Sequence, residues 1–385
     1  MSSSRAWRRP SEVEQGAASA PPVRGRASAR RVSPAPLRLP RLRHLSRLAA
    51  AVVGVALFIF ALEVTKAGSA GIVPLLDRLS VSGAANATGF GWLLAYLALS
   101  GSPVAAIGVT LLAGGSLTEA EAFAVVAGSR LGASFIVLAA GFILYLARRR
   151  NADGLYIGVV ALLTTFTTQG PALLLGLVSL HFGLLDGLAF NTPAGMLDLV
   201  DSAFGRPLDA LDSLLPGWML FAVGVGLLLA SFAVFDRALP QLEGEAEGIT
   251  RALHALRRRP LMFLLGCAVT LTTLSVAISL TVLVPLSLKG YLKREAIIPY
   301  VMGANITTFV DTLFASMLLG GETAFLVVLT QMVSVAVVSL LLLGGFYGPY
   351  SRVILAGAHW TTARPRHLAI FLGAIVAVPA ALLVV

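Results

Sequence analysis

Residues 293–319 decide the fold class; they read Lys-Arg-Glu-Ala-Ile-Ile-Pro-Tyr-Val-Met-Gly-Ala-Asn-Ile-Thr-Thr-Phe-Val-Asp-Thr-Leu-Phe-Ala-Ser-Met-Leu-Leu. The stretch is long enough to cross a bilayer, because about 20 residues of helix span the ~30 Å hydrocarbon core. Its centre nevertheless carries four polar residues: Asn305, Thr307, Thr308 and Asp311. In hydrocarbon such groups must find partners, so they face a protein interior, a cavity or an ion path. Gly303, just before them, is a place where a helix can break and expose backbone carbonyls.

Packing alone could also account for this polar centre, because Gly, Ser and Thr are common where membrane helices touch. For Thr307 or Thr308 by itself, packing is the favoured interpretation. For the whole cluster with Asp311, a polar site is favoured, since an ionisable residue inside a membrane helix is a functional hypothesis by default.

The composition predicts an all-α polytopic membrane protein. Of 385 residues, 57% are hydrophobic and only 12% are charged, whereas a soluble domain has about 25% charged residues. A single cysteine, Cys267, excludes internal disulfides and cysteine-based metal sites, and the five histidines have no metal-ligand spacing. There is no phosphate loop and no coupled acid, base or nucleophile set. We therefore expect neither an enzyme nor a bound cofactor.

The net charge of +10 comes largely from the first 47 residues, where eleven Arg stand against Glu12 and Glu14. Pro, Ser and Ala separate them, so this segment cannot bury a core and is predicted to be a disordered basic tail. The tail either contacts anionic lipid or only fixes the topology. It also resembles an organelle transit peptide. Nucleic acid is not an expected partner. Residues 48–385 are predicted to form the transmembrane domain.

The distribution of charge predicts the orientation in a plasma membrane. Lys and Arg concentrate in cytoplasmic loops, which places the tail and the four basic segments inside: Arg148–Arg150, Arg251–Arg259, Lys289–Arg294 and Arg352–Arg366. The acidic segment 186–212 is then outside. These placements agree only if residues 89–112 and 261–288 each enter and leave on the same side. Both are therefore expected to be re-entrant hairpins, the first opening outward and the second inward.

A weak internal repeat supports this arrangement. Residues 98–135 align with residues 273–310 at a shift of 175, with eight identities in 38 positions. Polar breaks fall on polar breaks, Ser100 on Ser275, and Gly128 falls on Gly303. The exits carry opposite charge, acidic at 119–121 and basic at 293–294, as inverted-topology repeats require. Repeat one covers about 88–147 and repeat two about 261–320. Ser100 and Ser275 should therefore converge near the bilayer midplane.

With these motifs the chain resembles the type II sodium/phosphate cotransporter family, including its bacterial members. Each of that family's two inverted repeats pairs a Gln-Ser-Ser-Ser hairpin motif with a downstream Gly-Ala-Asn-Ile-Gly-Thr-Thr motif. Residues 303–308 read Gly-Ala-Asn-Ile-Thr-Thr, and residues 99–102 and 274–277 stand at the hairpin positions. The resemblance covers roughly residues 88–345. The chain departs from the family at four positions: Leu99 and Leu274 replace Gln, Arg130 replaces Asn, and Thr307 replaces Gly.

The resemblance implies a secondary active transporter of a small inorganic or organic anion, in its most specific form a sodium-coupled phosphate symporter. The alternative is a non-transporting membrane scaffold that retains the fold, and a membrane-embedded enzyme is a third hypothesis. The predicted substrate ligands are Ser100, Ser102, Arg130, Ser275 and Asn305. The predicted ligands of the coupling ion, Na⁺, are Thr272, Thr273, Thr307, Thr308 and Asp311.

Two features leave alternatives open. Arg130 has a planar donor fork suited to phosphate or carboxylate, but it could instead pair with Asp311 or extend to the membrane interface. The polar break at residues 164–171, with Thr167, Thr168 and Gln169, is either a displaced element of the site or a packing motif.

Overall fold

The computed structural model describes residues 40–139, 142, 153–190, 192–238, 258–281, 283, 294–319 and 321–384. Within these ranges every regular element is a helix, which confirms the all-α prediction for the described part of the chain. The chain divides into two compact units, Met1–Arg43 and His44–Val385. Residues 1–39 of the predicted tail, the arginines at 148–150 and residues 251–257 and 289–293 lie outside the described ranges. Residues 40–47, also predicted as tail, are the start of the first helix.

Seven helical stretches in the described ranges are long and apolar enough to cross a membrane, as expected for a multi-pass membrane protein. They are Ala49–Ala67 in α1 (Pro40–Ala67), Glu119–Ala139 beginning with α5 (Glu119–Ala133), Gly154–His181 in α7 (Asp153–His181), Gly217–Phe235 in α9 (Gly217–Ala238), Arg294–Leu318 across α14 (Arg294–Thr307) and α15 (Val310–Leu318), α16 (Glu322–Gly344) and α18 (Pro365–Leu382).

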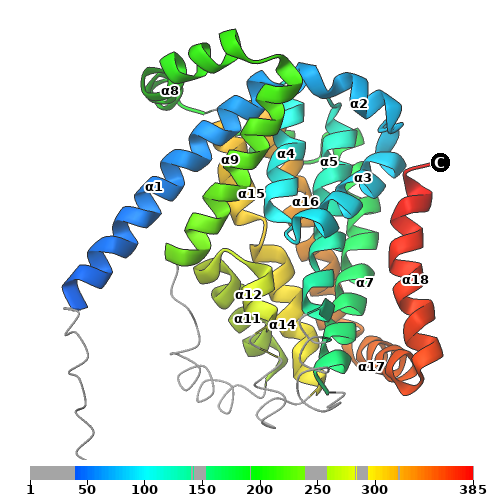
Figure 1. Ribbon diagram of the computed structural model, residues 1–385. Coiled ribbons are helices and arrows are strands. Elements are labelled where there is room, and N and C mark those ends of the chain that lie inside the picture. The colour runs from blue at the N-terminus through cyan, green and yellow to red at the C-terminus, as the bar shows by residue number, and fades with distance from the viewer. Residues whose placement is uncertain are drawn as a thin grey trace, which may run out of the picture. The chain divides into compact units, whose positions relative to one another are not determined.

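The first tight reversal of the chain lies between α3 (Gly83–Ala98) and α4 (Ser102–Ala113), where the sequence predicts a bend. α3 ends at Leu99, whose backbone is left-handed with φ 49°. That conformation costs a non-glycine residue about 1–2 kcal/mol. Pro103 lies in the first turn of α4, where its missing N–H removes no helical hydrogen bond. The chain then returns toward the end from which α3 came (Figure 1).

The second tight reversal lies between α11 (Arg259–Thr273) and α12 (Val276–Thr281). α11 ends at Leu274, which is left-handed with φ 48°. Leu274 follows Leu99 by 175 residues, so both predicted repeats reverse at the same position with the same backbone conformation. In Figure 1 α3 and α11 approach the middle of the bundle from opposite ends.

α5 packs against α3, and α14 packs against α11, in the same register. At four glycines an added Cβ would lie 2.1–2.4 Å from a carbonyl oxygen of the partner helix. The contacts are Gly128 on Thr88 and Gly91 on Val125 in the first pair, and Gly303 on Phe263 and Gly266 on Tyr300 in the second. Each residue of the second pair follows its counterpart by 175. The α3–α5 and α11–α14 pairs therefore use small residues to bring two backbones together in the same way.

Helices α5 and α14 form the centre of the bundle. Residues 122–133 of α5 and residues 297–306 of α14 are all buried, as expected of helices with other helices on every side. α7 packs against both of them and against α16. α18 lies beside α3, where the Tyr96 hydroxyl donates to the Ile375 carbonyl at 2.8 Å. α1 packs on α9 through Phe58 and Phe232.

The remaining elements lie at the two ends of the bundle. The short elements η1 (Ser69–Ile72), α2 (Val73–Arg78) and η2 (Asp186–Leu188) and the amphipathic α8 (Ala194–Leu214) lie at one end. α17 (Tyr347–Ala363) crosses the other end (Figure 1). There the Arg259 guanidinium lies over the Tyr347 ring, 4.4 Å from its centroid.

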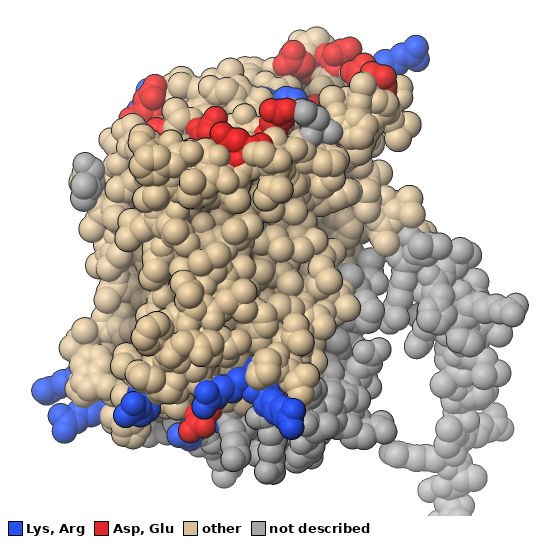
Figure 2. Space-filling model, turned by 180° about the vertical axis from the view of Figure 1, so that it is seen from behind, with Lys and Arg blue, Asp and Glu red and all other residues tan. Residues whose placement is uncertain are grey.

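Charged side chains gather at these two ends, with an uncharged belt between them (Figure 2). One end carries the carboxylates of α8 together with Glu119, Glu121 and Glu322. The opposite end carries arginines at the starts of α11, α14 and α18 and on α17. This separation matches the predicted alternation of acidic and basic loops.

Two predicted helix breaks are wrong. α14 runs unbroken through Gly303, because this glycine is packed against α11; the chain breaks instead at Thr308 and Phe309, between α14 and α15. α7 runs unbroken through residues 164–171 with Pro171 inside the helix. The threonine hydroxyls there bond to carbonyls of the preceding turn, which satisfies them within the helix.

Candidate functional site

Arg130 is the one arginine described inside the uncharged belt, and its side chain is 3% exposed. It comes from the last turn of α5. Its guanidinium donates through Nη1 to Ser102 Oγ at 3.2 Å and to Thr308 Oγ1 at 3.0 Å. Through Nη2 it donates to Thr312 Oγ1 at 2.7 Å and to Asp311 Oδ1 at 3.5 Å. One side chain thus ties the first reversal to the break between α14 and α15.

The Arg130–Asp311 contact is the one ion pair found among the described residues. Asp311 lies in the first turn of α15, where the positive end of the helix dipole favours a carboxylate. Its Oδ1 accepts from Arg130 and from the backbone N–H and hydroxyl of Thr312, while Oδ2 has no hydrogen-bond partner. The Arg130 guanidinium also lies over the Phe309 ring, 4.7 Å from its centroid. The Arg130 guanidinium is therefore contacted on several sides.

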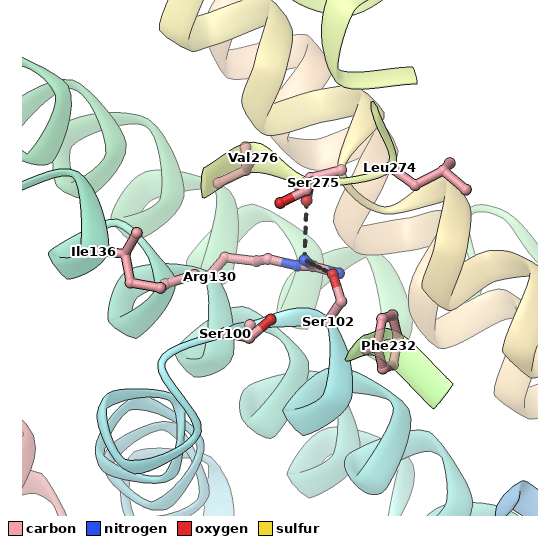
Figure 3. Close-up of a pocket in the computed structure, with 11 residues that line it drawn as sticks. Ser100, Ser102, Arg130, Ile136, Phe232, Leu274, Ser275 and Val276 are labelled. Atoms are coloured by element: carbon pink, nitrogen blue, oxygen red, sulfur yellow. Dashed lines mark hydrogen bonds between the residues drawn. The ribbon is translucent and has the colours of Figure 1, made fainter. Parts of the chain in front are cut away.

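A cavity of about 40 Å³ lies beside the guanidinium, between the two reversals (Figure 3). Ser100, Gly101 and Ser102 line it from the first reversal, and Leu274, Ser275 and Val276 line it from the second. Thr308 and Phe232 complete much of the wall. In Figure 3 Ser102 and Ser275 flank the guanidinium on opposite sides. Ser100 and Ser275 both line this cavity, so the two polar breaks meet as expected, and their place at the bilayer midplane stays a prediction.

The cavity presents chemistry suited to a small anion. A cavity of roughly 10–15 Å³ already holds one water, so this one has room for a few waters or a small polar ion. Arg130 supplies the positive charge and Ser102, Ser275 and Thr308 supply hydroxyls. The Nε of Arg130 has no partner among the described groups, so the donor fork is not fully used. Buried hydrogen bonds to a charged group contribute about 1.5–3 kcal/mol each.

The cavity contains four of the five predicted substrate ligands: Ser100, Ser102, Arg130 and Ser275. Asn305 is not among its lining residues. Its amide donates to Thr165 Oγ1 at 3.1 Å, because Asn305 faces α7 across the helix interface. Arg130 contacts Asp311, so the pairing that the sequence left open is present; Arg130 also lines the cavity, and its role as an anion ligand stays a prediction. Extension to the membrane interface is wrong, because the side chain is buried.

The predicted Na⁺ ligands are not brought together. Thr272 is exposed and donates to carbonyls of its own helix, as do Thr273 and Thr307. Thr308 and Asp311 both bind Arg130. A Na⁺ at these two oxygens would lie a few ångströms from the guanidinium, and two unit charges 4 Å apart repel by about 4 kcal/mol at an effective dielectric of 20. The residues therefore do not fit a sodium ion at this point.

Sequence reasoning missed three contributors to the site: Thr312, Phe309 and Phe232. Thr312 could have been predicted as a polar neighbour of Asp311 in the sequence. Phe232 comes from α9, and no sequence pattern connects it with the site. The polar residues of α7 form a separate cluster, in which Gln331 Nε2 donates to Gln169 Oε1 at 2.9 Å. Among the described residues no three His, Cys, Asp or Glu side chains are grouped as metal ligands.

Comparison with models of known protein families, with curated proteins and with solved structures finds no match to this chain.

Proposed function

We propose that this protein is a secondary transporter of a small anion, and that the cavity beside Arg130 is its substrate site. The observation that carries the proposal is a buried guanidinium lining a cavity at the meeting point of two tight reversals. A charge in the membrane interior is costly and marks substrate or ion pathways. Transporters place their substrate sites where broken helices of two repeats meet near the midplane.

The architecture supports the same proposal. We infer that the α3–α5 and α11–α14 segments belong to two inverted-topology repeats. The left-handed leucines 99 and 274, the glycine contacts related by 175 residues and the opposite directions of the two reversals all agree with this inference. Alternating access then consists of one repeat moving against the other around the fixed site.

The orientation follows from the two charged ends. Since Lys and Arg concentrate on the cytoplasmic side, the end with Arg259, Arg294 and Arg364 faces the cytoplasm and the α8 end faces outward. We therefore propose a cytoplasmic N-terminus and the plasma membrane as the location.

Phosphate is the first substrate to test, because the resemblance to the sodium/phosphate cotransporters implies it and a guanidinium fork matches its oxygens. The resemblance also implies sodium as the coupling ion, and the charge on Arg130 argues against it in this chain. A non-transporting scaffold is the competing proposal. It requires the fold but no solute path.

Uptake of labelled phosphate by sealed liposomes containing the purified protein tests the proposal. We expect saturable uptake that unlabelled phosphate competes, with and without a sodium gradient as separate arms. Protein-free liposomes and an Arg130→Lys variant are the controls. Uptake equal to that of protein-free liposomes for phosphate, sulfate and small carboxylates would favour the scaffold.

A further inference from the structure

Arg130 has no counterpart in the second repeat. The residue 175 positions later is Asn305, which donates a hydrogen bond to Thr165 of α7 and does not line the cavity. Conversely, the second repeat contributes three hydrogen-bond acceptors for the Arg130 guanidinium: Thr308, Asp311 and Thr312. The first repeat has Ala133, Ile136 and Val137 at the corresponding positions. The site is therefore built asymmetrically: the first repeat gives the cation and the Ser102 hydroxyl, whereas the carboxylate and two further hydroxyls come from the second.

These oxygens are the ones that would otherwise attract a cation from solution. Asp311 is a carboxylate with 8% exposure, and Thr308 and Thr312 are hydroxyls beside it. The guanidinium meets all three at 2.7–3.5 Å. It thus occupies the position of a bound cation, and it is covalently part of the chain.

No other described charge reaches this point. The helices packed against α15 are α4, which has no titratable side chain, and α16, whose one carboxylate is Glu322 at its first residue. Lys66 of α1 donates to the carbonyl of Leu319, at the far end of α15. The charge balance of the site therefore depends on Arg130, Asp311 and whatever occupies the cavity.

On the basis of the proposed anion transport, we propose that Arg130 supplies the positive charge that a coupling cation would bring, so that transport needs no sodium and carries net negative charge. In the empty site Arg130 and Asp311 cancel. A bound monoanion shares the guanidinium with Asp311 and leaves the site with one net negative charge. Moving the loaded site across the membrane therefore moves charge with the anion.

The proposal predicts two properties of labelled-phosphate flux in liposomes. When choline replaces all sodium, the initial rate of phosphate uptake stays within about twofold of the rate in sodium, since no sodium binds. An inside-positive potassium diffusion potential, set with valinomycin, increases accumulation, by about tenfold for each ~59 mV and each charge moved. An inside-negative potential decreases it. A cation-coupled symporter with net positive charge responds in the opposite sense.

Two variants separate the tethered charge from a structural ion pair. Arg130→Asn gives the first repeat the residue that the second repeat has at this position, and its flux should be lost or become sodium-dependent. The double variant Arg130→Asn, Asp311→Asn also removes the carboxylate that Arg130→Asn would leave buried without its partner, so that a folded protein can be assayed. The sodium-independent flux of this double variant should also be lost. Arg352→Lys, on the surface of α17, is the matched control and should transport like the wild type.

Four results would overturn the inference. Flux that requires sodium, or flux that an inside-negative potential fails to slow, contradicts it while leaving anion transport intact. Sodium-independent flux that survives in the double variant also contradicts it. Absence of anion flux under every ionic condition contradicts this inference and the proposed function together.

Discussion

Replacing Gly303 by alanine should destabilise the protein, although alanine favours helices over glycine. The new Cβ would lie 2.1 Å from the Phe263 carbonyl oxygen and 3.0 Å from the Cys267 amide nitrogen. Ordinary contact needs about 3.4 Å, so α11 and α14 must separate by more than 1 Å. Overpacking of this kind costs about 1–3 kcal/mol. The upper half of that range is expected here, because a backbone carbonyl cannot turn aside as a flexible side chain can.

The assay is thermal unfolding of the purified protein in detergent. Gly128→Ala is the repeat counterpart and should lose a similar amount, since its Cβ would lie 2.2 Å from the Thr88 carbonyl oxygen. Gly226→Ala in α9 and Gly373→Ala in α18 are matched controls with no atom within 4 Å, and they should gain up to about 1 kcal/mol. If Gly303→Ala or Gly128→Ala behaves like the controls, the close packing of the two helix pairs is refuted.

Three further predictions concern the site, the topology and the reversals. Arg130→Lys should express normally but bind phosphate at least about tenfold more weakly, because Lys loses the donor fork and one hydrogen bond to a charged group contributes about 1.5–3 kcal/mol. Arg130→Ala should abolish phosphate binding. If adding Asp311→Asn to Arg130→Ala restored binding, Arg130 would be only a structural partner of Asp311. A cysteine at Asp209 in a Cys267→Ala background should react with an impermeant thiol reagent from outside, and labelling from the cytoplasmic side alone would reverse the orientation. Leu99→Gly should raise stability in thermal unfolding by up to about 1 kcal/mol, because glycine adopts positive φ without strain, and a loss would mean that the leucine side chain is needed there.

The position of the reversals was predictable from the sequence, but their backbone was not. The 175-residue shift placed Ser100 with Ser275 correctly, because polar breaks within the apolar runs of a membrane protein must turn away from lipid and toward a shared interior. Left-handed backbone is signalled by Gly or Asn. Leu99 and Leu274 give no such signal, and the conformation becomes evident only when both reversals are compared.

The content of the site was only partly predictable, because side-chain direction depends on helix phase and neighbours. Asn305 stood beside Thr307 and Thr308 in the sequence, yet it faces α7 because Thr165 meets it there. The position of the break decided which residues entered the cavity. An expected break at Gly303 would have exposed Asn305, whereas the observed one follows Thr307 and releases Thr308 toward Arg130.

Long-range pairings were beyond the sequence. Gln169 and Gln331 are 162 residues apart and meet across α7 and α16. A polar break on α7 was visible, but nothing local could distinguish a packing pair from a site element. Neither glutamine is among the residues that line the cavity beside Arg130.

The central claim is that the cavity beside Arg130 binds a small anion, and ligand-dependent thermal stabilisation tests it most directly. A ligand that binds the native state raises its stability according to its concentration relative to the dissociation constant. Increasing phosphate at constant ionic strength should raise the unfolding temperature of the wild type and of Arg352→Lys, but should have little effect on Arg130→Lys. An equal shift in all three proteins, or no shift in the wild type with phosphate, sulfate or small carboxylates, would contradict the account.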